Sequence, residues 1–379
     1  MGKLITKCEV IDKAHKLGFD DIGFTTADIF VEQRKVLSDR RENYSWLTEK
    51  GMDLIQGTDP KSTFPEAKSI IVLVDAYFQN SFPESMIGKF GRCYLDDDRV
   101  TRGSQYRRMK AFCDYLKENG IKSKIPSNLP HRLAAARAGL GTFGKNCLIY
   151  SNKVARQSSW IIVLGVVVNQ EFEPDEPTSK EDCPKWCKNT CIVACPTNAL
   201  IGPRNIDPRR CISFLSYYGE GITPLELREP MGMWVYGCDR CQNVCPRNEA
   251  WQAQELPRNN VLEVRAADFE LTKLLHMDKD YFQKRIWPHM FYMSADEIWR
   301  WKMNVARVMG NSHDSIYIPH LVRAFLENDD VRAKGMAAWA IGHIGGSKAV
   351  EALEKILKES TGMPREEIIQ ALENAIHVI

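Results

Sequence analysis

The chain is organised around CPKWCKNTCIVACP, residues 183–196, and YGCDRCQNVCPRN, residues 236–248. Each run ends in a Cys-Pro pair, at Cys195 and at Cys245. With the isolated Cys211, this region holds eight of the twelve cysteines. A cuboidal 4Fe-4S cluster takes four thiolates, so eight thiolates suffice for two clusters. We therefore expect a two-cluster, ferredoxin-like module here.

The spacing also predicts how the ligands divide. In two-cluster ferredoxins the cysteine before the proline ligates the cluster of the other run. That rule assigns one cluster to Cys183, Cys187, Cys191 and Cys245. It leaves the second cluster with Cys195, Cys211, Cys238 and Cys241.

Zinc is the alternative metal, because the pair at Cys238 and Cys241 also has zinc-like spacing and eight thiolates would make two four-cysteine sites. The two Cys-Pro endings favour the clusters. The first run reads C-x3-C-x3-C-x3-C-P, one residue wider in its first two gaps than the ferredoxin pattern. Its cysteines at every fourth position also fit one face of a helix.

Composition describes an ordinary globular protein of two or three domains, with 379 residues, 44% hydrophobic and 26% charged. The polar N-terminus shows no export signal, so the C-x-x-C pattern indicates metal ligation in a reducing, cytoplasmic setting. The longest apolar run, residues 160–168, is about half a membrane span, and we expect no membrane partner. We expect Cys8, Cys113 and Cys147 to be small core residues.

Three segments are predicted. Helical patterns lie at residues 9–17, 107–119 and 133–138, and hydrophobic strands at 21–25, 69–77 and 160–168. This alternation predicts an α/β or α+β domain over residues 1–172. A turn-rich cluster domain follows over residues 173–257, and a helical domain over 258–379.

The helical domain contains a repeat. Arg300, Lys302, Ala306 and Gly310 recur thirty-two positions later as Arg332, Lys334, Ala338 and Gly342, and Arg365 and Ala371 continue the register. This pattern predicts an all-α, HEAT-like array whose alanines sit at helix crossings and whose glycines end the helices. Such an array is either a structural cap or a surface for a macromolecule.

The net charge is only +2, yet residues 99–156 hold thirteen Lys and Arg against Asp114 and Glu118. This excess suits a tRNA backbone or a phosphate-bearing cofactor, or is a solvated face. A simple electron carrier needs neither flanking domain, so we expect a redox enzyme. The glycine-rich AGLGTFGKN, residues 138–146, follows a helix and fits neither a dinucleotide turn nor a P-loop.

Further motifs give the chain a family resemblance. Beside the second cysteine run stand RCISFLS at 210–216, CPTNAL at 195–200, GFTTAD at 23–28, TDP at 58–60, AGLGTFGKN and GMAAWAIGHIGG at 335–346. In this order they resemble the epoxyqueuosine reductase family, relatives of the cobalamin-dependent reductive dehalogenases. The resemblance covers nearly the whole chain.

The resemblance implies a cobalamin-binding domain of nitroreductase-like fold, an inserted module with two 4Fe-4S clusters, and a helical tail. Family members pass electrons through the clusters to cobalamin and reduce epoxyqueuosine to queuosine in tRNA, as part of queuosine biosynthesis. A ferredoxin or flavodoxin-like donor and a monomeric state are expected. The implied cofactor-binding residues are Cys93, Gly141, Gly144, Lys145, Asn146 and Ser213.

The substrate half departs from the family. Ile125 stands where the family has its proton-donating Asp, Gly57 stands where an Arg is usual, and Gln105-Tyr106-Arg107 replaces an Asp-Tyr-His stretch. The substitute donors proposed from sequence are His131 and Tyr106, with a carboxylate run at Asp96, Asp97 and Asp98. The alternatives are a corrinoid and iron–sulfur reductase for another substrate (small-molecule cleavage or corrinoid reactivation) and a non-catalytic electron-transfer protein.

Overall fold

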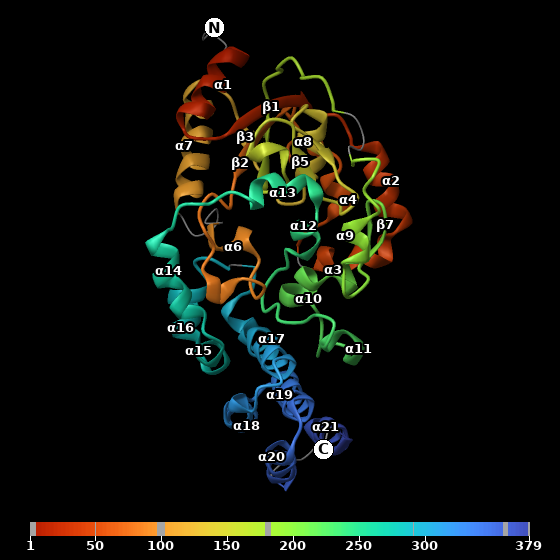
Figure 1. The fold of residues 1–379 in the computed structure, drawn as a ribbon. Coiled ribbons are helices and arrows are strands. Elements are labelled where there is room, and N and C mark those ends of the chain that lie inside the picture. Colours follow the sequence, from red (N-terminus) through yellow and green to blue (C-terminus); the bar gives the residue numbers. More distant parts are fainter. Residues whose placement is uncertain are drawn as a thin grey trace.

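The computed structural model describes residues 5–49, 51–96, 103–178, 183–290, 292–358 and 363–377. A sheet flanked by helices lies at one end, a turn-rich segment in the middle and a helical tail at the other end (Figure 1). The predicted fold class is confirmed: a mixed α and β domain, a double-cluster module and HEAT repeats.

The main sheet has the order β1-β2-β6-β3 and is antiparallel throughout. Its strands are β1 (Asp21–Thr26), β2 (Ser69–Ala76), β6 (Ile161–Val168) and β3 (Ser123–Lys124). Ile71 pairs with Phe24 on one side and with Val166 on the other. Helices cover both faces, which explains why β2 and β6 read as unbroken hydrophobic runs. The three strands expected from sequence are present, and the two-residue β3 was not predicted.

Two helices cover one face of the sheet. They are α1 (Lys7–Lys16) and α7 (Ser104–Glu118), which pack Val10 and Phe112 against Leu73. α1 begins with a capping box in which Thr6 and Glu9 each bond the other's backbone N–H. The other face is covered by α8 (His131–Arg137), whose alanines approach the sheet closely. The first domain is thus a three-layer structure.

Short elements complete this domain. They are α2 (Val31–Asp39), α3 (Arg41–Glu49), α4 (Leu54–Gly57), α5 (Pro60–Thr63), α6 (Arg92–Asp96) and the hairpin of β4 (Gly141–Phe143) with β5 (Ile149–Ser151). The glycine-rich stretch at 138–146 therefore forms β4 and the hairpin turn.

The cysteine region consists of short elements around a small core. They are α9 (Thr190–Val193), β7 (Leu200–Gly202), β8 (Asn205–Ile206), α10 (Ile212–Tyr218), α11 (Leu225–Arg228), α12 (Arg240–Asn243) and α13 (Pro246–Gln252). The buried apolar cluster of this region is Ile212, Leu215, Leu227, Met231 and Trp234. So small a core leaves the region dependent on its neighbours and ligands for order.

The tail begins with α14 (Asn260–Ala266), α15 (Leu271–His276) and α16 (Lys279–Tyr281), and continues with α17 (Ile298–Asn311), α18 (Ile318–Glu327), α19 (Val331–Ile344), α20 (Ser347–Lys358) and α21 (Met363–His377). α19 packs between α17 and α21. The hydrophobic core of the tail also includes residues that precede the tail in sequence: Phe90, Tyr94 and Tyr236. No described helix is long and apolar enough to cross a membrane.

The expectation that glycines end the repeat helices is wrong. Gly310 and Gly342 lie inside α17 and α19, at the helix crossings. A Cβ at Gly310 would lie 2.8 Å from Ala340 Cα, and one at Gly342 would lie 2.5 Å from Ala371 O. The alanines do sit at the crossings, as expected, and the glycines let the helix axes approach closely.

This geometry predicts opposite effects for two substitutions in α19. Gly342→Ala should lower the melting temperature, because backbone atoms of α21 block the new methyl group. Gly335→Ala is the matched control: its Cβ first meets side-chain atoms of Ile222 at 3.1 Å and Glu367 at 3.4 Å. Alanine is worth about 1 kcal/mol over glycine in a helix, so the control should be neutral or stabilising. Equal melting temperatures for the two variants would contradict this account of the crossing.

Candidate iron–sulfur site

The two cysteine runs lie side by side. α9 of the first run packs against α12 of the second. Arg240 Nε donates a hydrogen bond of 3.3 Å to Ala194 O, which joins the two helices near their ends. Pro196 and Pro246 each follow the last cysteine of a run, and α13 starts at the second proline. The chain therefore presents both runs from one compact unit.

The thiols influence one another both within the groups that the spacing predicted and between them. Burial, together with the neighbouring thiols of Cys245, Cys187 and Cys183, raises the pKa of Cys191 to about 11. Burial is also the largest cause of the raised pKa of Cys241, and the nearby thiols of Cys211, Cys191 and Cys195 add to it. Burial raises the pKa of Cys238 as well, and the thiols of Cys241 and Cys211 add to the shift. Cys191 is a neighbour of Cys241, so the two groups adjoin. The ligand assignment itself stays a prediction.

Zinc and 4Fe-4S clusters differ in how they arrange four thiolates. A tetrahedral zinc ion at about 2.3 Å from each sulfur would draw four thiols around a single point. In the described part of the chain, no three Cys, His, Asp or Glu side chains converge in that way. A 4Fe-4S cluster binds each thiolate through a different iron, so its ligands surround the cluster at larger spacing.

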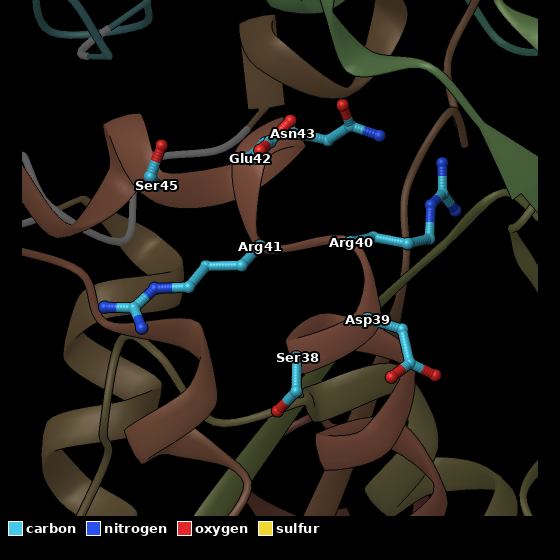
Figure 2. Close-up of a pocket in the computed structure, with 7 residues that line it drawn as sticks. All are labelled: Ser38, Asp39, Arg40, Arg41, Glu42, Asn43 and Ser45. Carbon is cyan, nitrogen blue, oxygen red and sulfur yellow. The ribbon is translucent and has the colours of Figure 1, made fainter.

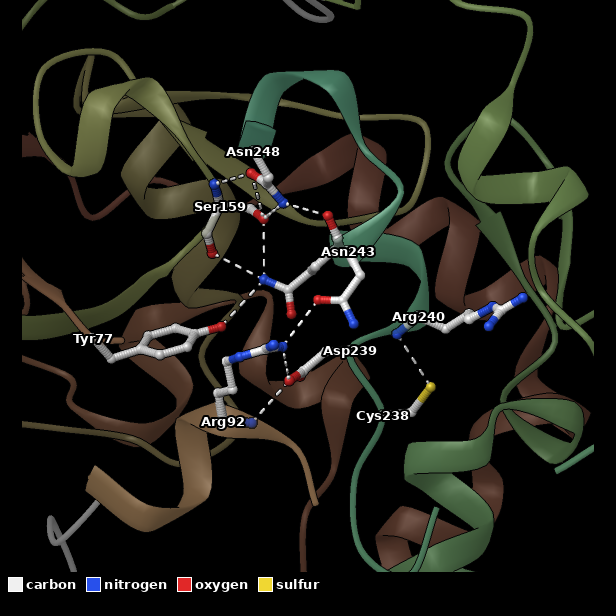
Figure 3. A network of polar contacts seen from close by, with 9 residues as sticks. Tyr77, Arg92, Ser159, Cys238, Asp239, Arg240, Asn243 and Asn248 are labelled. Carbon is white, nitrogen blue, oxygen red and sulfur yellow. Dashed lines mark hydrogen bonds and ion pairs between the residues drawn. The ribbon is translucent and has the colours of Figure 1, made fainter. Parts of the chain in front are cut away.

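A buried polar network docks the second run onto the first domain (Figure 3). Asn248 Nδ2 donates to Ser159 Oγ at 2.9 Å, and its Oδ1 accepts from the Ser159 N–H at 2.9 Å. Gln242 Nε2 donates to Tyr77 Oη at 3.1 Å and to Ser159 Oγ at 3.0 Å. Because these groups are buried, each unpaired member would cost about 1–3 kcal/mol.

A buried ion pair adds to this contact. Arg92 of α6 places Nη1 3.1 Å from Asp239 Oδ2 and 2.9 Å from Asn243 Oδ1, and its backbone N–H donates to the same carboxylate at 2.9 Å. Burial raises the pKa of Asp239, and Arg92 opposes that shift. The pair fixes the turn that carries Cys238 and Cys241.

The helical tail holds the segment between Cys211 and Cys238. One face of α17 carries Arg300, Asn304, Arg307 and Asn311, which donate to backbone carbonyls of residues 216–234. Asn304 reaches Ser216 O at 2.7 Å and Arg307 reaches Gly232 O at 2.6 Å. Burial lowers the pKa of Arg307 to about 9, which still leaves it charged at neutral pH. The tail is therefore a support for the cluster module.

Of the predicted cofactor residues in the hairpin, Lys145 and Asn146 contact the cysteine region, and the two glycines pack within the hairpin. A Cβ at Gly144 would lie 2.4 Å from the Tyr150 ring, and one at Gly141 would lie 2.4 Å from Tyr150 O. Asn146 donates to Tyr150 Oη at 2.9 Å and to Cys241 O at 3.3 Å. The carbonyl of Lys145 accepts from Arg204 N. Both glycines thus permit close packing, and Asn146 contacts the second run.

The two remaining cofactor candidates lie apart from the hairpin. Cys93, on α6, is half-buried and packs against the tail core. It influences the pKa of both Tyr77 and Tyr94, so it lies near their hydroxyls. Ser213, on α10, lies two residues after Cys211; burial raises the pKa of that thiol, and the backbone of Phe214 and Ser213 opposes the shift.

The altered residues of the substrate half have structural roles. Ile125 is half-buried and packs into the core beneath α1 and α7. Gly57 has no room for a side chain, because a Cβ there would lie 1.9 Å from Asn128 O. Gln105 is buried and donates to Asp75 Oδ2 at 2.8 Å, beside the ion pair of Asp75 with Arg108. No carboxylate stands at the position of Ile125.

The substitute donors differ in their surroundings. His131 Nδ1 accepts a hydrogen bond from Gly165 N at 2.8 Å, which places the ring proton on Nε2. Tyr106 lies half-buried in the first turn of α7. Asp97 and Asp98 lie outside the described residues, as does the side chain of Asp96.

The remaining cysteines and the basic span depart from simple expectations. Cys8 is exposed, so it is not the core residue predicted, whereas Cys113 and Cys147 are half-buried. Several basic residues are already engaged: Lys110 with Asp114, Lys122 with Glu66, Arg137 with the carbonyls of Asp28 and Ile29. Fewer cations than the sequence suggests are therefore available to an anionic partner.

One hollow lies beside the first domain's short helices. It measures about 530 Å³ and is lined by residues 38–43 and Ser45, at the turn between α2 and α3 (Figure 2). Arg40 and Arg41 point in different directions there. Arg40 Nη2 donates to Ile206 O at 2.8 Å, so it anchors the turn to the cysteine region. This hollow contains none of the predicted site residues.

Sequence reasoning missed several residues that support the cysteines. Tyr150, Ser159 and the polar face of α17 follow no metal-ligand spacing. For α17 a signal existed: polar residues at intervals of three and four inside an otherwise hydrophobic helix. For Tyr150 and Ser159 the partners are distant in sequence, so no local pattern marks them.

Comparison with known proteins extends the description to the whole chain. Residues 183–248 match a family described as a 4Fe-4S double cluster binding domain, and residues 292–373 match HEAT repeats. The epoxyqueuosine reductase of Bacillus subtilis is 31% identical over 386 residues, covering 97% of this chain and 95% of the relative. That of Bacillus cereus is 29% identical over 388 residues, covering 98% and 97%.

Solved structures agree with this likeness. A selenomethionine-labelled epoxyqueuosine reductase superposes with a TM-score of 0.80 at 28% identity, covering 97% of this chain and 98% of that one. An epoxyqueuosine reductase with an epoxyqueuosine-modified tRNA-Tyr stem loop superposes with a TM-score of 0.79 at 28% identity, covering 98% of both.

The buried pair predicts a large effect for one substitution. Arg92→Ala should lower the free energy of unfolding by about 3–5 kcal/mol, because it leaves the Asp239 carboxylate buried without its cation. Urea denaturation of the anaerobic protein measures this.

The loss of stability in Arg92→Ala should depend on pH. Losing Arg92 lifts the folded-state pKa of Asp239 further above its ordinary 3.8, so the stability deficit should grow as pH rises through that folded pKa. The deficit should be larger at pH 8 than at pH 5. Lys110→Ala is the control, since its pair with Asp114 is exposed and should contribute less than about 0.5 kcal/mol. Equal losses for both variants would show that the buried pair does not hold the turn.

Proposed function

The chain belongs to the epoxyqueuosine reductase family, and on that premise we propose that it reduces epoxyqueuosine in tRNA to queuosine. The observation that carries the proposal is the extent of the likeness to these reductases, which includes the sheet domain, the cysteine region and the tail. The reaction consumes two electrons and two protons, and the epoxide oxygen leaves as water. The chain must therefore hold electron carriers, a reactive centre, the tRNA and a proton source.

The electron carriers are two 4Fe-4S clusters. One is ligated by Cys183, Cys187, Cys191 and Cys245, and the other by Cys195, Cys211, Cys238 and Cys241. The influence of Cys245, Cys187 and Cys183 on the pKa of Cys191 supports the first group, and that of Cys211 on the pKa of Cys241 and Cys238 supports the second. The docking network and α17 keep the second run in place while electrons pass. Electrons come from a low-potential donor of the ferredoxin or flavodoxin type.

Cobalamin is the reactive centre, and it supplies a strongly reducing metal that accepts the electrons and acts on the epoxide. Its binding region is the first domain beside Cys93, where Tyr77 and Tyr94 are buried neighbours. Ser213 and Lys145 are the further contacts proposed for cobalamin. Gly141, Gly144 and Asn146 act through the hairpin that packs on the cysteine module.

The tRNA is bound by exposed cations of the basic span together with the helical tail. Arg107, Lys117 and Arg132 are exposed or partly exposed on α7 and α8 and suit phosphate contacts. A reductase acting on tRNA works in the cytoplasm, and we propose that it does so as a monomer.

A second candidate function follows from Ile125. The resemblance sets Ile125 where the family has its proton donor, and the apolar side chain of Ile125 packs in the core. If neither Tyr106 nor His131 supplies the proton, the same cofactors would serve a different acceptor, such as a small molecule or a corrinoid protein. His131 is the weaker donor, because Nδ1 already accepts the Gly165 N–H.

Iron analysis tests the ligand assignment. The anaerobically purified protein should contain about eight irons and eight sulfides per chain. Cys241→Ala should lose about half of them, because the cluster it helps to ligate cannot assemble fully. Cys113→Ala is the control, since Cys113 is a half-buried cysteine outside the region and should keep full iron. Zinc in place of iron, or full iron in Cys241→Ala, would contradict the assignment.

A turnover assay tests the substrate. With a low-potential reductant and cobalamin, the wild-type protein should convert epoxyqueuosine-containing tRNA to the queuosine form, detected by mass spectrometry of the nucleosides. Tyr106→Phe should lower the rate at least tenfold if Tyr106 is the donor, with clusters and cobalamin spectrum unchanged. A protein that binds both cofactors but leaves the tRNA unchanged would favour the second candidate function.

A further inference from the structure

The buried hydroxyl of Tyr150 lies against one of the proposed cluster ligands. Tyr150 belongs to β5 and is 1% exposed. Its Oη lies 3.0 Å from Cys245 Sγ and donates a hydrogen bond to that sulfur. The other bond of the hydroxyl comes from Asn146 Nδ2 at 2.9 Å. Because the oxygen accepts from Asn146, its single hydrogen is directed to the sulfur.

The ring of Tyr150 is held on several sides. The guanidinium of Arg247 lies 4.2 Å from the ring centroid, and Arg247 also donates to Thr142 Oγ1 at 3.1 Å. Gly144 lies so close to the ring that a Cβ would come within 2.4 Å of it. The hydroxyl therefore has little freedom to turn away from Cys245.

The hydrogen-bond contacts at Cys187, Cys195 and Cys238 are longer. Thr197 Oγ1 is 3.7 Å from Cys195 Sγ, and Thr190 Oγ1 is 4.0 Å from Cys187 Sγ. Backbone N–H groups of Ala199 and Arg240 reach Cys195 and Cys238 at 3.3 and 3.4 Å. Among these contacts the one from Tyr150 is the shortest.

A hydrogen bond to a ligand sulfur acts on the cluster. A cluster that accepts an electron places more negative charge on its sulfurs, so a donor at a sulfur stabilises the reduced state and raises the reduction potential. The effect is stronger in a buried, low-dielectric setting. We propose that Tyr150, oriented by Asn146, sets the reduction potential of the cluster ligated by Cys245 and makes the two clusters inequivalent.

Asn146 extends this role to both ligand groups. Its amide also donates to the carbonyl of Cys241, a ligand of the other cluster, at 3.3 Å. One hairpin side chain thereby links the hydroxyl donor of one cluster with the backbone of the other. Asn146 is a positioning residue, because it acts on the sulfur through Tyr150. The inference rests on the ligand division in the proposed function.

Potentiometric titration followed by EPR tests the proposal on the anaerobically reconstituted full chain. Tyr150→Phe removes only the hydroxyl and keeps the ring beneath Arg247. One of the two cluster midpoints should move to a more negative potential, while the other midpoint and the iron content stay at wild-type values. Tyr281→Phe is the matched control, a half-buried tyrosine of the tail whose hydroxyl donates to Asp268 O at 2.8 Å, and it should move neither midpoint. Unchanged midpoints in Tyr150→Phe would overturn the proposal, as would an equal shift of both.

Two further measurements keep the proposal testable if Tyr150→Phe assembles poorly. Pulsed EPR of the reduced wild-type protein in D₂O should show an exchangeable deuteron coupled to one cluster, and its absence would overturn the proposal. Asn146→Ala should shift the same midpoint in the same direction by a smaller amount. No shift would contradict the role of Asn146 in orienting Tyr150. A wild-type protein without iron–sulfur signals would overturn the proposed ligand set itself, whereas two normal clusters with an unmoved Tyr150→Phe would overturn the role of Tyr150 alone.

Discussion

The cysteine region depends on the buried polar contact that fixes its second run to the first domain. Five apolar side chains form the core of that region, which is too little to order eight thiols. Order is supplied from two sides: Asn248 and Gln242 bond Ser159 at the start of β6, and α17 bonds the carbonyls between Cys211 and Cys238. Buried hydrogen bonds are directional, so they position a ligand turn more sharply than apolar packing does.

In this arrangement the sheet domain and the tail both hold the cysteine region in place. The antiparallel sheet presents Ser159 and the β4–β5 hairpin toward the cysteines. The tail core continues through Tyr236 to Phe90 and Tyr94, so the segment around Cys93 is held by the tail as well as by the sheet domain. A tail that served only as an RNA surface would not need the buried charges of Arg300 and Arg307.

Much of the fold was readable from local patterns. The hydrophobic runs predicted β2 and β6, and the recurrence of Arg300 and Ala306 as Arg332 and Ala338 predicted the HEAT array. Cysteine spacing predicted the double-cluster domain, because ligand geometry imposes a fixed pattern on a short segment. The roles of Gly310 and Gly342 were predicted wrongly, since a glycine near a helix end looks the same in sequence whether it caps the helix or lies at a crossing. Tyr150 and Ser159 were not predicted at all, because their partners lie about ninety residues away in sequence.

The central claim is that eight cysteines divide between two clusters across the two runs. Tyr150 donates a hydrogen bond to a ligand of one cluster, the sulfur of Cys245. A crystal structure of the anaerobically reconstituted chain, with anomalous data at the iron edge, measures this directly. We predict one cluster on Cys183, Cys187, Cys191 and Cys245, a second on Cys195, Cys211, Cys238 and Cys241, and the Tyr150 hydroxyl on the Cys245 sulfur. A different division of the ligands, or zinc at either position, would contradict the account.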